Sequence, residues 1–75
     1  MSKAEKTLDK MRANPRDWRI DDLEAVATRH GLTIRKPRGS HVIFQKPGTV
    51  LAVSIPAHRP IKPVYVRALI ELIDA

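Results

Sequence analysis

The chain has 75 residues, no cysteine and a formal net charge of +6. The absence of cysteine excludes a disulfide framework and a cysteine-based zinc site, and this length allows one domain with a small core. No apolar run approaches the roughly 18 residues of a membrane-spanning helix, so we expect a cytoplasmic protein without a membrane partner. An excess of positive charge attracts acidic partners, nucleic acid among them.

The first predicted helix is short and amphipathic. Ala4, Leu8 and Met11 have the spacing i, i+4, i+7, which predicts a helix from about Ser2 to Ala13. Trp18 follows in a connector, where we expect it to anchor this helix to the rest of the protein. Stacking on a nucleic-acid base is the alternative role for this side chain.

A second helix is predicted to begin around Asp21-Asp22 and to end at Gly31. Acidic side chains suit the positive end of a helix dipole, and glycine suits the left-handed position after a helix. The buried stripe of this helix is predicted to be Leu23, Val26 and Ala27. His30 lies in the last turn, where we expect a capping or packing role rather than catalysis.

Three strand patterns follow, over residues 32–36, 40–45 and 50–55, and their short links predict an antiparallel meander. Alternation places apolar side chains on one face, namely Leu32, Ile34, Val42, Phe44, Leu51, Val53 and Ile55. The opposite face, which we call the open face, carries Thr33, Arg35, His41, Ile43, Gln45, Ala52 and Ser54.

A last helix is predicted to open at Pro63, since proline suits the first helical position. Its predicted core stripe is Val66, Leu69, Ile70 and Ile73. The chain order is therefore helix, helix, three strands, helix. This order predicts an α+β fold with helices on one face of a three-stranded antiparallel sheet.

Positive charge is concentrated between Glu24 and Glu71, where there is no acidic residue. Eleven basic or titratable side chains lie there: Arg29, His30, Arg35, Lys36, Arg38, His41, Lys46, His58, Arg59, Lys62 and Arg67. Hard divalent cations take carboxylate and other oxygen ligands, so we do not expect a magnesium-dependent nuclease site in this stretch. The histidine spacing matches no zinc pattern either. We expect no metal and no cofactor.

The sequence Gly39-Ser40-His41 is the cluster best suited to chemistry. A histidine titrates at about pH 6.5, so it can give or take a proton in the cell. The neighbouring cations, which would hold a phosphodiester and stabilise charge on its oxygens, are Lys36, Arg38 and Lys46. In RNA the 2′-OH supplies a nucleophile, so a histidine acting as general base or acid can cut the strand without metal.

His58 and Arg59 follow the third strand in a loop. One interpretation makes them surface polar groups. The other makes them a second cationic clamp on the phosphate, or the acid that complements His41. A Ser-His-Asp hydrolase is not expected, because no carboxylate near His41 in the sequence would orient its ring.

Several motifs together resemble the HicA family of type II toxin-antitoxin systems. They are Gly39-Ser40-His41-Val42-Ile43-Phe44, Ser54-Ile55-Pro56-Ala57-His58 and Lys62-Pro63, the last opening a helix with Val66-Arg67-Ala68-Leu69-Ile70. The resemblance runs from about Ile20 to Ile73. It divides the chain into an N-terminal helical extension, residues 1–18, and a HicA-like domain, residues 19–75.

The resemblance implies a double-stranded-RNA-binding-domain-like fold and an mRNA interferase, a toxin that cleaves RNA and arrests translation. His41 inherits the catalytic role. The residues expected to bind RNA are Lys36, Arg38, Ser40, Lys46, His58 and Arg59. The implied partners are mRNA and a HicB-type antitoxin that covers His41, and we expect the free protein to be a monomer.

Two other classes of function remain open at the level of sequence. The first is a non-catalytic RNA-binding module of the same fold, which grips RNA by backbone charge and shape. The second is a protein-interaction domain whose basic face meets an acidic partner. Cleavage of RNA separates the first from an enzyme, and retention of RNA at physiological salt separates the second from both.

Overall fold

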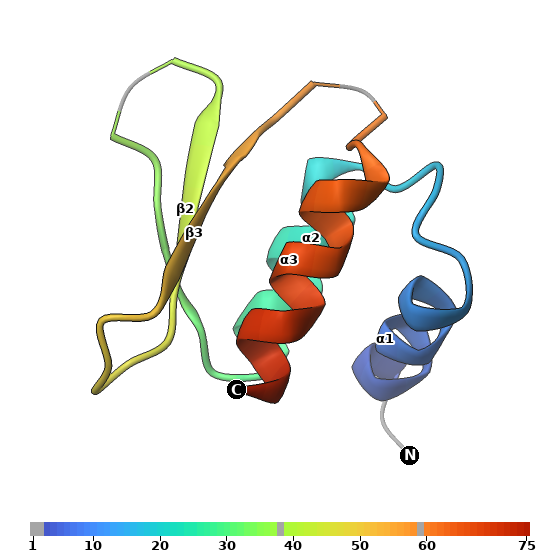
Figure 1. The fold of residues 1–75 in the computed structure, drawn as a ribbon, viewed down its shortest axis with the longest axis horizontal. Helices are drawn as coiled ribbons and strands as arrows, with labels where there is room; N and C mark the ends of the chain where they lie inside the picture. The colour runs from blue at the N-terminus through green and yellow to red at the C-terminus, as the bar shows by residue number, and fades with distance from the viewer. Residues whose placement is uncertain (1–2, 38, 59) are drawn as a thin grey trace.

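The order of elements in the structure is the predicted one (Figure 1). The computed structural model describes residues 3–37, 39–58 and 60–75, so Ser2, Arg38 and Arg59 lie outside it, as does the Ala4 side chain. The elements are α1 (Lys3–Ala13), α2 (Ile20–Arg29), β1 (Thr33–Arg35), β2 (His41–Gln45), β3 (Ala52–Pro56) and α3 (Pro63–Asp74). The prediction of an α+β fold is confirmed.

The three strands form one antiparallel sheet in the order β1-β2-β3, with β2 in the middle. Arg35 of β1 lies opposite Ile43 of β2, and His41 of β2 lies opposite Pro56 of β3. All three strands are shorter than predicted, because ladder pairing begins only at Thr33, His41 and Ala52, and the third strand ends one residue later than predicted, at Pro56.

The helices form two layers on one side of the sheet (Figure 1). Helix α2 packs against β1 and helix α3 packs against β3, while α1 packs against both of these helices. Figure 1 shows α1 on the side of α2 and α3 that faces away from the sheet. The open face of the sheet is therefore uncovered by any helix of the described chain.

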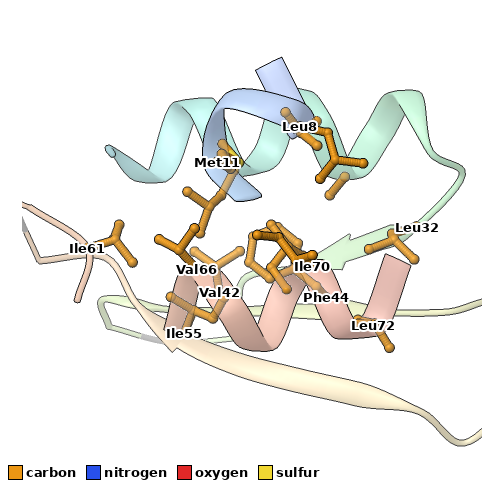
Figure 2. Packing of buried hydrophobic residues seen from close by; sticks show 14 residues of the cluster. Leu8, Met11, Leu32, Val42, Phe44, Ile55, Ile61, Val66, Ile70 and Leu72 are labelled. Atoms are coloured by element: carbon orange, nitrogen blue, oxygen red, sulfur yellow. The ribbon is translucent and has the colours of Figure 1, made fainter. Parts of the chain in front are cut away.

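The core lies between the sheet and the helices (Figure 2). Phe44, Ile55 and Val66 are fully buried, as the alternation of the strands and the stripe of α3 predicted. The predicted buried stripe of α2 is confirmed as well. Burying apolar surface stabilises the fold by about 25 cal/mol per Å², so this shared contact is what holds helices and sheet together.

Two burial predictions differ from the structure. Leu51 is 44% exposed, because it precedes the first paired residue of β3 and alternation does not act outside a ladder. Leu72 is buried although it lies off the predicted stripe. Helix α3 contacts α1, α2 and β3, so it buries a wider arc than one stripe.

The N-terminal helix is attached to the rest of the chain through its second half and through the connector that follows it. Leu8 and Met11 belong to the shared core, and Arg12 forms a two-pronged ion pair with Asp74 at the end of α3, 2.5 Å between Nη2 and Oδ1. Trp18 packs partly against the core, and its carbonyl accepts a 2.8 Å hydrogen bond from the backbone N–H of Ile61. The predicted anchoring role of Trp18 is confirmed.

The end of α2 follows the predicted signals. His30 is the C-cap residue and is half-buried, so its predicted capping or packing position is confirmed. Gly31 has φ +81°, the left-handed conformation that glycine adopts without a steric penalty. This turn reverses the chain from α2 into β1, and it places β1 beside α2.

Candidate active site

Two segments that are far apart in the sequence meet at one end of the sheet. His41 begins β2 and is paired with Pro56, the last residue of β3. One residue further out on each side, the backbone N–H of Ala57 donates a 2.6 Å hydrogen bond to the carbonyl of Ser40. The structure thus brings the Ser40-His41 segment next to the start of the loop that carries His58.

The His41 side chain is exposed on the open face of the sheet. Its cross-strand partner Pro56 points to the same face, because directly paired residues of an antiparallel ladder share a side. Within the described part of the chain, no side chain hydrogen-bonds to the imidazole. Among the described residues, no side chain therefore competes with a substrate for the ring nitrogens.

Gly39 sets the approach to this histidine. Its φ of +64° lies in the left-handed region, and a Cβ added there would meet no atom within 4 Å. The reason for glycine here is thus backbone conformation rather than lack of space. A residue with a side chain would favour a different path into β2 and would displace Ser40 and His41.

Arg35 is an open-face cation that was not among the residues predicted to bind RNA. It lies opposite Ile43 in the ladder, and His41 is two residues before Ile43. Diagonal neighbours of this kind are about 7–8 Å apart, within reach of one phosphodiester. The alternation already placed Arg35 on the open face, so that signal was present in the sequence.

Acidic residues lie in the helical layers and the connector, and the sheet has none. The acidic residues all lie in the three helices or at Asp17 in the connector between α1 and α2, and the strands carry none. The described open face carries Arg35 and His41 without a neighbouring carboxylate. Such a surface attracts anions and stabilises negative charge that develops on a bound phosphate.

Lys36 has a closer partner than the sequence suggested. Its ammonium Nζ lies 2.8 Å from Oε1 of Glu24 in α2, and the hydrogen bond to this carboxylate is the main cause of the raised pKa of Lys36. The sequence between Glu24 and Glu71 contains no acidic residue, but in the folded protein a carboxylate from outside this stretch contacts one of its cations. Exposed pairs of this kind are weak, so Lys36 can still exchange this partner for a phosphate.

Lys46 lies at the wrong end of β2 to act with His41. It follows the last residue of this five-residue strand, so at about 3.3 Å per residue it is on the order of 17 Å from His41. It lies instead near the end of α3, where its charge adds to the effect of the Arg12 hydrogen bond in lowering the pKa of Asp74. The expectation that Lys46 lies beside His41 was wrong. In an extended strand, each residue of separation in sequence adds its full length to the separation in space.

His58 opens onto a surface pocket of about 610 Å³. Pro56, the partner of His41, lies on its wall, together with Lys62 and Tyr65 from the start of α3 and Arg16 and Asp17 from the connector after α1. Neither Arg16 nor Tyr65 was predicted to belong to a site. No sequence signal joins Arg16 to His58, because the pocket forms where the connector after α1 meets the stretch between Pro56 and Tyr65.

The described residues include no group of three or more His, Cys, Asp or Glu side chains placed to hold a metal ion. None of the helices in the described ranges is long and apolar enough to cross a membrane.

The fold and the site define a small basic α+β protein with a histidine on the open, acid-free face of a three-stranded sheet. Residues 20–75 match the model of the family described as the HicA toxin of bacterial toxin-antitoxin systems. The chain belongs to the HicA toxin family and is a toxin of a toxin-antitoxin system, which implies an antitoxin partner in general terms. Neither the comparison with curated proteins nor that with solved structures gives a match, so the likeness to double-stranded-RNA-binding domains stays a prediction.

Proposed function

We propose that this toxin is an endoribonuclease that cleaves RNA by proton transfer at His41, inhibits translation, and is neutralised by a HicB-type antitoxin that covers His41. The observation that carries the proposal is the exposed imidazole at the start of the central strand, on a face where the strands carry no acid. Membership of a toxin family adds to it, since a toxin needs an activity that harms the cell.

In the proposed reaction His41 acts as general base and takes the proton of a ribose 2′-OH. The 2′-oxygen then bonds to the adjacent phosphorus, and the bond from phosphorus to the 5′-oxygen breaks. The 5′-oxygen leaves with a proton, for which His58 is the candidate donor because its loop is tied to Ser40 beside His41. The products are a 2′,3′-cyclic phosphate and a 5′-OH, and positioned proton transfer of this kind contributes about 10²–10⁴-fold in rate.

Phosphate contacts complete the proposal. Arg35 lies on the same face as His41, where its guanidinium can hold the scissile phosphate through two hydrogen bonds. The Ser40 hydroxyl and Lys36 lie at the same end of the sheet and are further contacts. Arg38 and Arg59, which are also predicted to bind RNA, lie outside the described residues and keep their predicted role. Lys46 is too far along β2 to hold the same phosphate.

A non-catalytic RNA-binding module is the second candidate. One observation favours it: among the residues described, no side chain orients the His41 ring. In catalytic triads a hydrogen-bonded partner holds the histidine ring in the orientation and tautomer that proton transfer needs. A histidine without such a partner is less well placed to act as a base. In this case the same cations would bind RNA by its backbone without cutting it.

Incubation of the chain with labelled single-stranded RNA in excess EDTA tests the proposal. The wild type should cut the RNA, and His41→Ala should lower the rate by at least about 100-fold with an unchanged melting temperature. A matched strand carrying 2′-deoxyribose at the cut site should survive, since the nucleophile is missing. Binding without cleavage by the wild type would establish the second candidate instead.

A further inference from the structure

The pocket beside His41 is built from two parts of the chain with different origins. Most of the wall comes from residues that belong to the segment that matches the family, namely Pro56, His58, Pro60, Ile61, Lys62, Pro63 and Tyr65. Arg16 and Asp17 supply the rest and lie before that segment. The N-terminal extension therefore adds side chains to a surface that adjoins the candidate active site.

The extension holds its part of the pocket firmly in place. Its Trp18 forms a backbone bridge with Ile61, which also lines the pocket, and the Trp18 Nε1–H donates a 2.7 Å hydrogen bond to the carbonyl of Asn14. The Arg16 N–H donates to the Asn14 side chain at 3.2 Å. The segment from Asn14 to Trp18 is thus fixed at both sides of Arg16, and the pocket is formed before any ligand arrives.

The lining suits a nucleotide. A volume of about 610 Å³ lies within the range of ordinary small-ligand sites. Arg16 and Lys62 supply two cations, and His58 belongs to the same lining. Tyr65 supplies an aromatic ring, whereas Phe44 is fully buried in the core and offers no surface to a base.

We propose that this pocket binds one nucleotide of the RNA next to the scissile phosphate, with its base against Tyr65 and its phosphate held by Arg16 and Lys62. The proposal rests on the RNA-cleaving function proposed above and gives it a substrate subsite. Adjacency carries it: Pro56 lies on the pocket wall and is the cross-strand partner of His41, so the pocket begins at the residue next to His41 on the sheet.

Asp17 provides a test of opposite sign, because it is an acidic residue in the described lining of the pocket. Its negative charge opposes a phosphate, so its removal should have the opposite sign to the removal of Arg16. Asp17 has φ +63°, in the left-handed region where asparagine is also accommodated. Asp17→Asn therefore removes the charge without a new backbone strain.

The experiment measures RNA affinity in the full chain carrying His41→Ala, so that cleavage does not interfere. Arg16→Ala and Lys62→Ala should each weaken binding and lower the slope of log affinity against log salt by about 0.7 per lost phosphate contact. Asp17→Asn should tighten binding. Lys10→Ala, an exposed cation on α1 outside the pocket, is the control for net charge and should change affinity by about twofold or less.

Tyr65 is tested by a double comparison. Tyr65→Leu keeps an apolar side chain for packing but removes the ring, and it should weaken binding about tenfold, as expected for one stacked base. RNA with a single abasic position at the subsite should lose about as much affinity on the wild-type pocket and almost nothing further on Tyr65→Leu. Thermal melts of each variant check that the fold is retained.

The outcomes separate this proposal from the one on which it rests. Pocket variants that behave like Lys10→Ala, in a protein whose cleavage depends on His41, overturn the subsite and leave the ribonuclease standing. Pocket variants that weaken RNA binding in a protein that never cuts RNA support the subsite and overturn the ribonuclease. Absence of RNA binding by every form overturns both.

Discussion

The two ends of strand β2 carry different chemistry. At one end His41 is exposed beside Ser40 and Pro56, next to a pocket with cations and an aromatic ring. At the other end the β2–β3 hairpin carries Lys46 and two exposed apolar side chains, Val50 at 94% and Leu51 at 44%. The same short sheet thus presents a polar, cationic end and an end with no grouping of catalytic residue types.

The difference shows that the basic character of the sequence is not spread evenly over the fold. Lys46 is separated from His41 by the length of a strand, although the two are close in sequence. Lys36 is paired with Glu24 of α2. The site depends on which loops meet, and the two loops at the His41 end are joined by the bond between Ala57 and Ser40.

The largest expected effect is a loss of stability on removal of Phe44, a core residue of β2, because both ends of the strand need the folded sheet. Phe44→Ala removes a fully buried ring from the core and should lower the free energy of unfolding by about 3–5 kcal/mol. Chemical denaturation measures this value. Gln45→Ala, on the other face of the same strand, is the control and should have a much smaller effect. A melting temperature equal to that of the wild type would contradict the placement of Phe44 in the core.

The glycines of the two loops give a matched pair. Gly39 and Gly48 both have positive φ, and a Cβ added at either position would meet no atom within 4 Å. Alanine at either position should cost about 1–2 kcal/mol of stability through backbone strain alone. Only Gly39→Ala should also slow RNA cleavage, because only that loop leads into His41. Equal loss of cleavage in both variants would mean that stability, not position, controls activity.

The two cations Arg35 and Lys46 compare the ends directly. Arg35→Ala should slow cleavage about tenfold or more, as expected when a group that stabilises transition-state charge is removed. Lys46→Ala also removes one positive charge, but at a position on the order of 17 Å from His41 along the strand. It should leave the cleavage rate nearly unchanged. The rates are compared at low salt and saturating RNA. A larger loss for Lys46→Ala would place the substrate at the hairpin end.

The smallest effect is expected at the end of α3 near the hairpin, where Arg12 hydrogen-bonds to Asp74 and lowers its pKa below the ordinary value of 3.8. A carboxyl with a lowered pKa stabilises the fold at neutral pH, and this stabilisation is lost as pH falls through its value in the folded state. Asp74→Asn should therefore lower the melting temperature slightly at neutral pH. The difference from the wild type should vanish in acid and shrink at high salt. A constant difference at every pH would assign it to packing instead.

Local patterns predicted the elements well for identifiable reasons. Alternation in β2 assigned Val42 and Phe44 to the core and His41 to the open face, because successive side chains of a paired strand must point to opposite sides. The helical spacing of the α2 stripe predicted its buried side for the same kind of reason. The prediction failed at Leu51, where the residue lies outside the ladder and the rule does not apply.

The candidate site was predicted only in part. The motif Gly39-Ser40-His41 could be placed at the start of the second strand from sequence, since one short segment carries it. The pairing of Lys36 with Glu24, the distance of Lys46 and the contribution of Arg16 were not predicted. Each depends on a separation in space between residues that are distant in sequence or lie at opposite ends of one element.

The sequence by itself determined the type and order of the elements, the face on which each apolar side chain of a paired strand lies, and the position of the catalytic candidate. These follow from periodicity and from single residues such as glycine and proline, which act over a few neighbours. The tertiary structure alone decided which charges meet, which loops lie side by side, and that the N-terminal extension completes a pocket. Those results depend on how layers pack, because contacts between distant segments are fixed by the shared core and not by any local pattern.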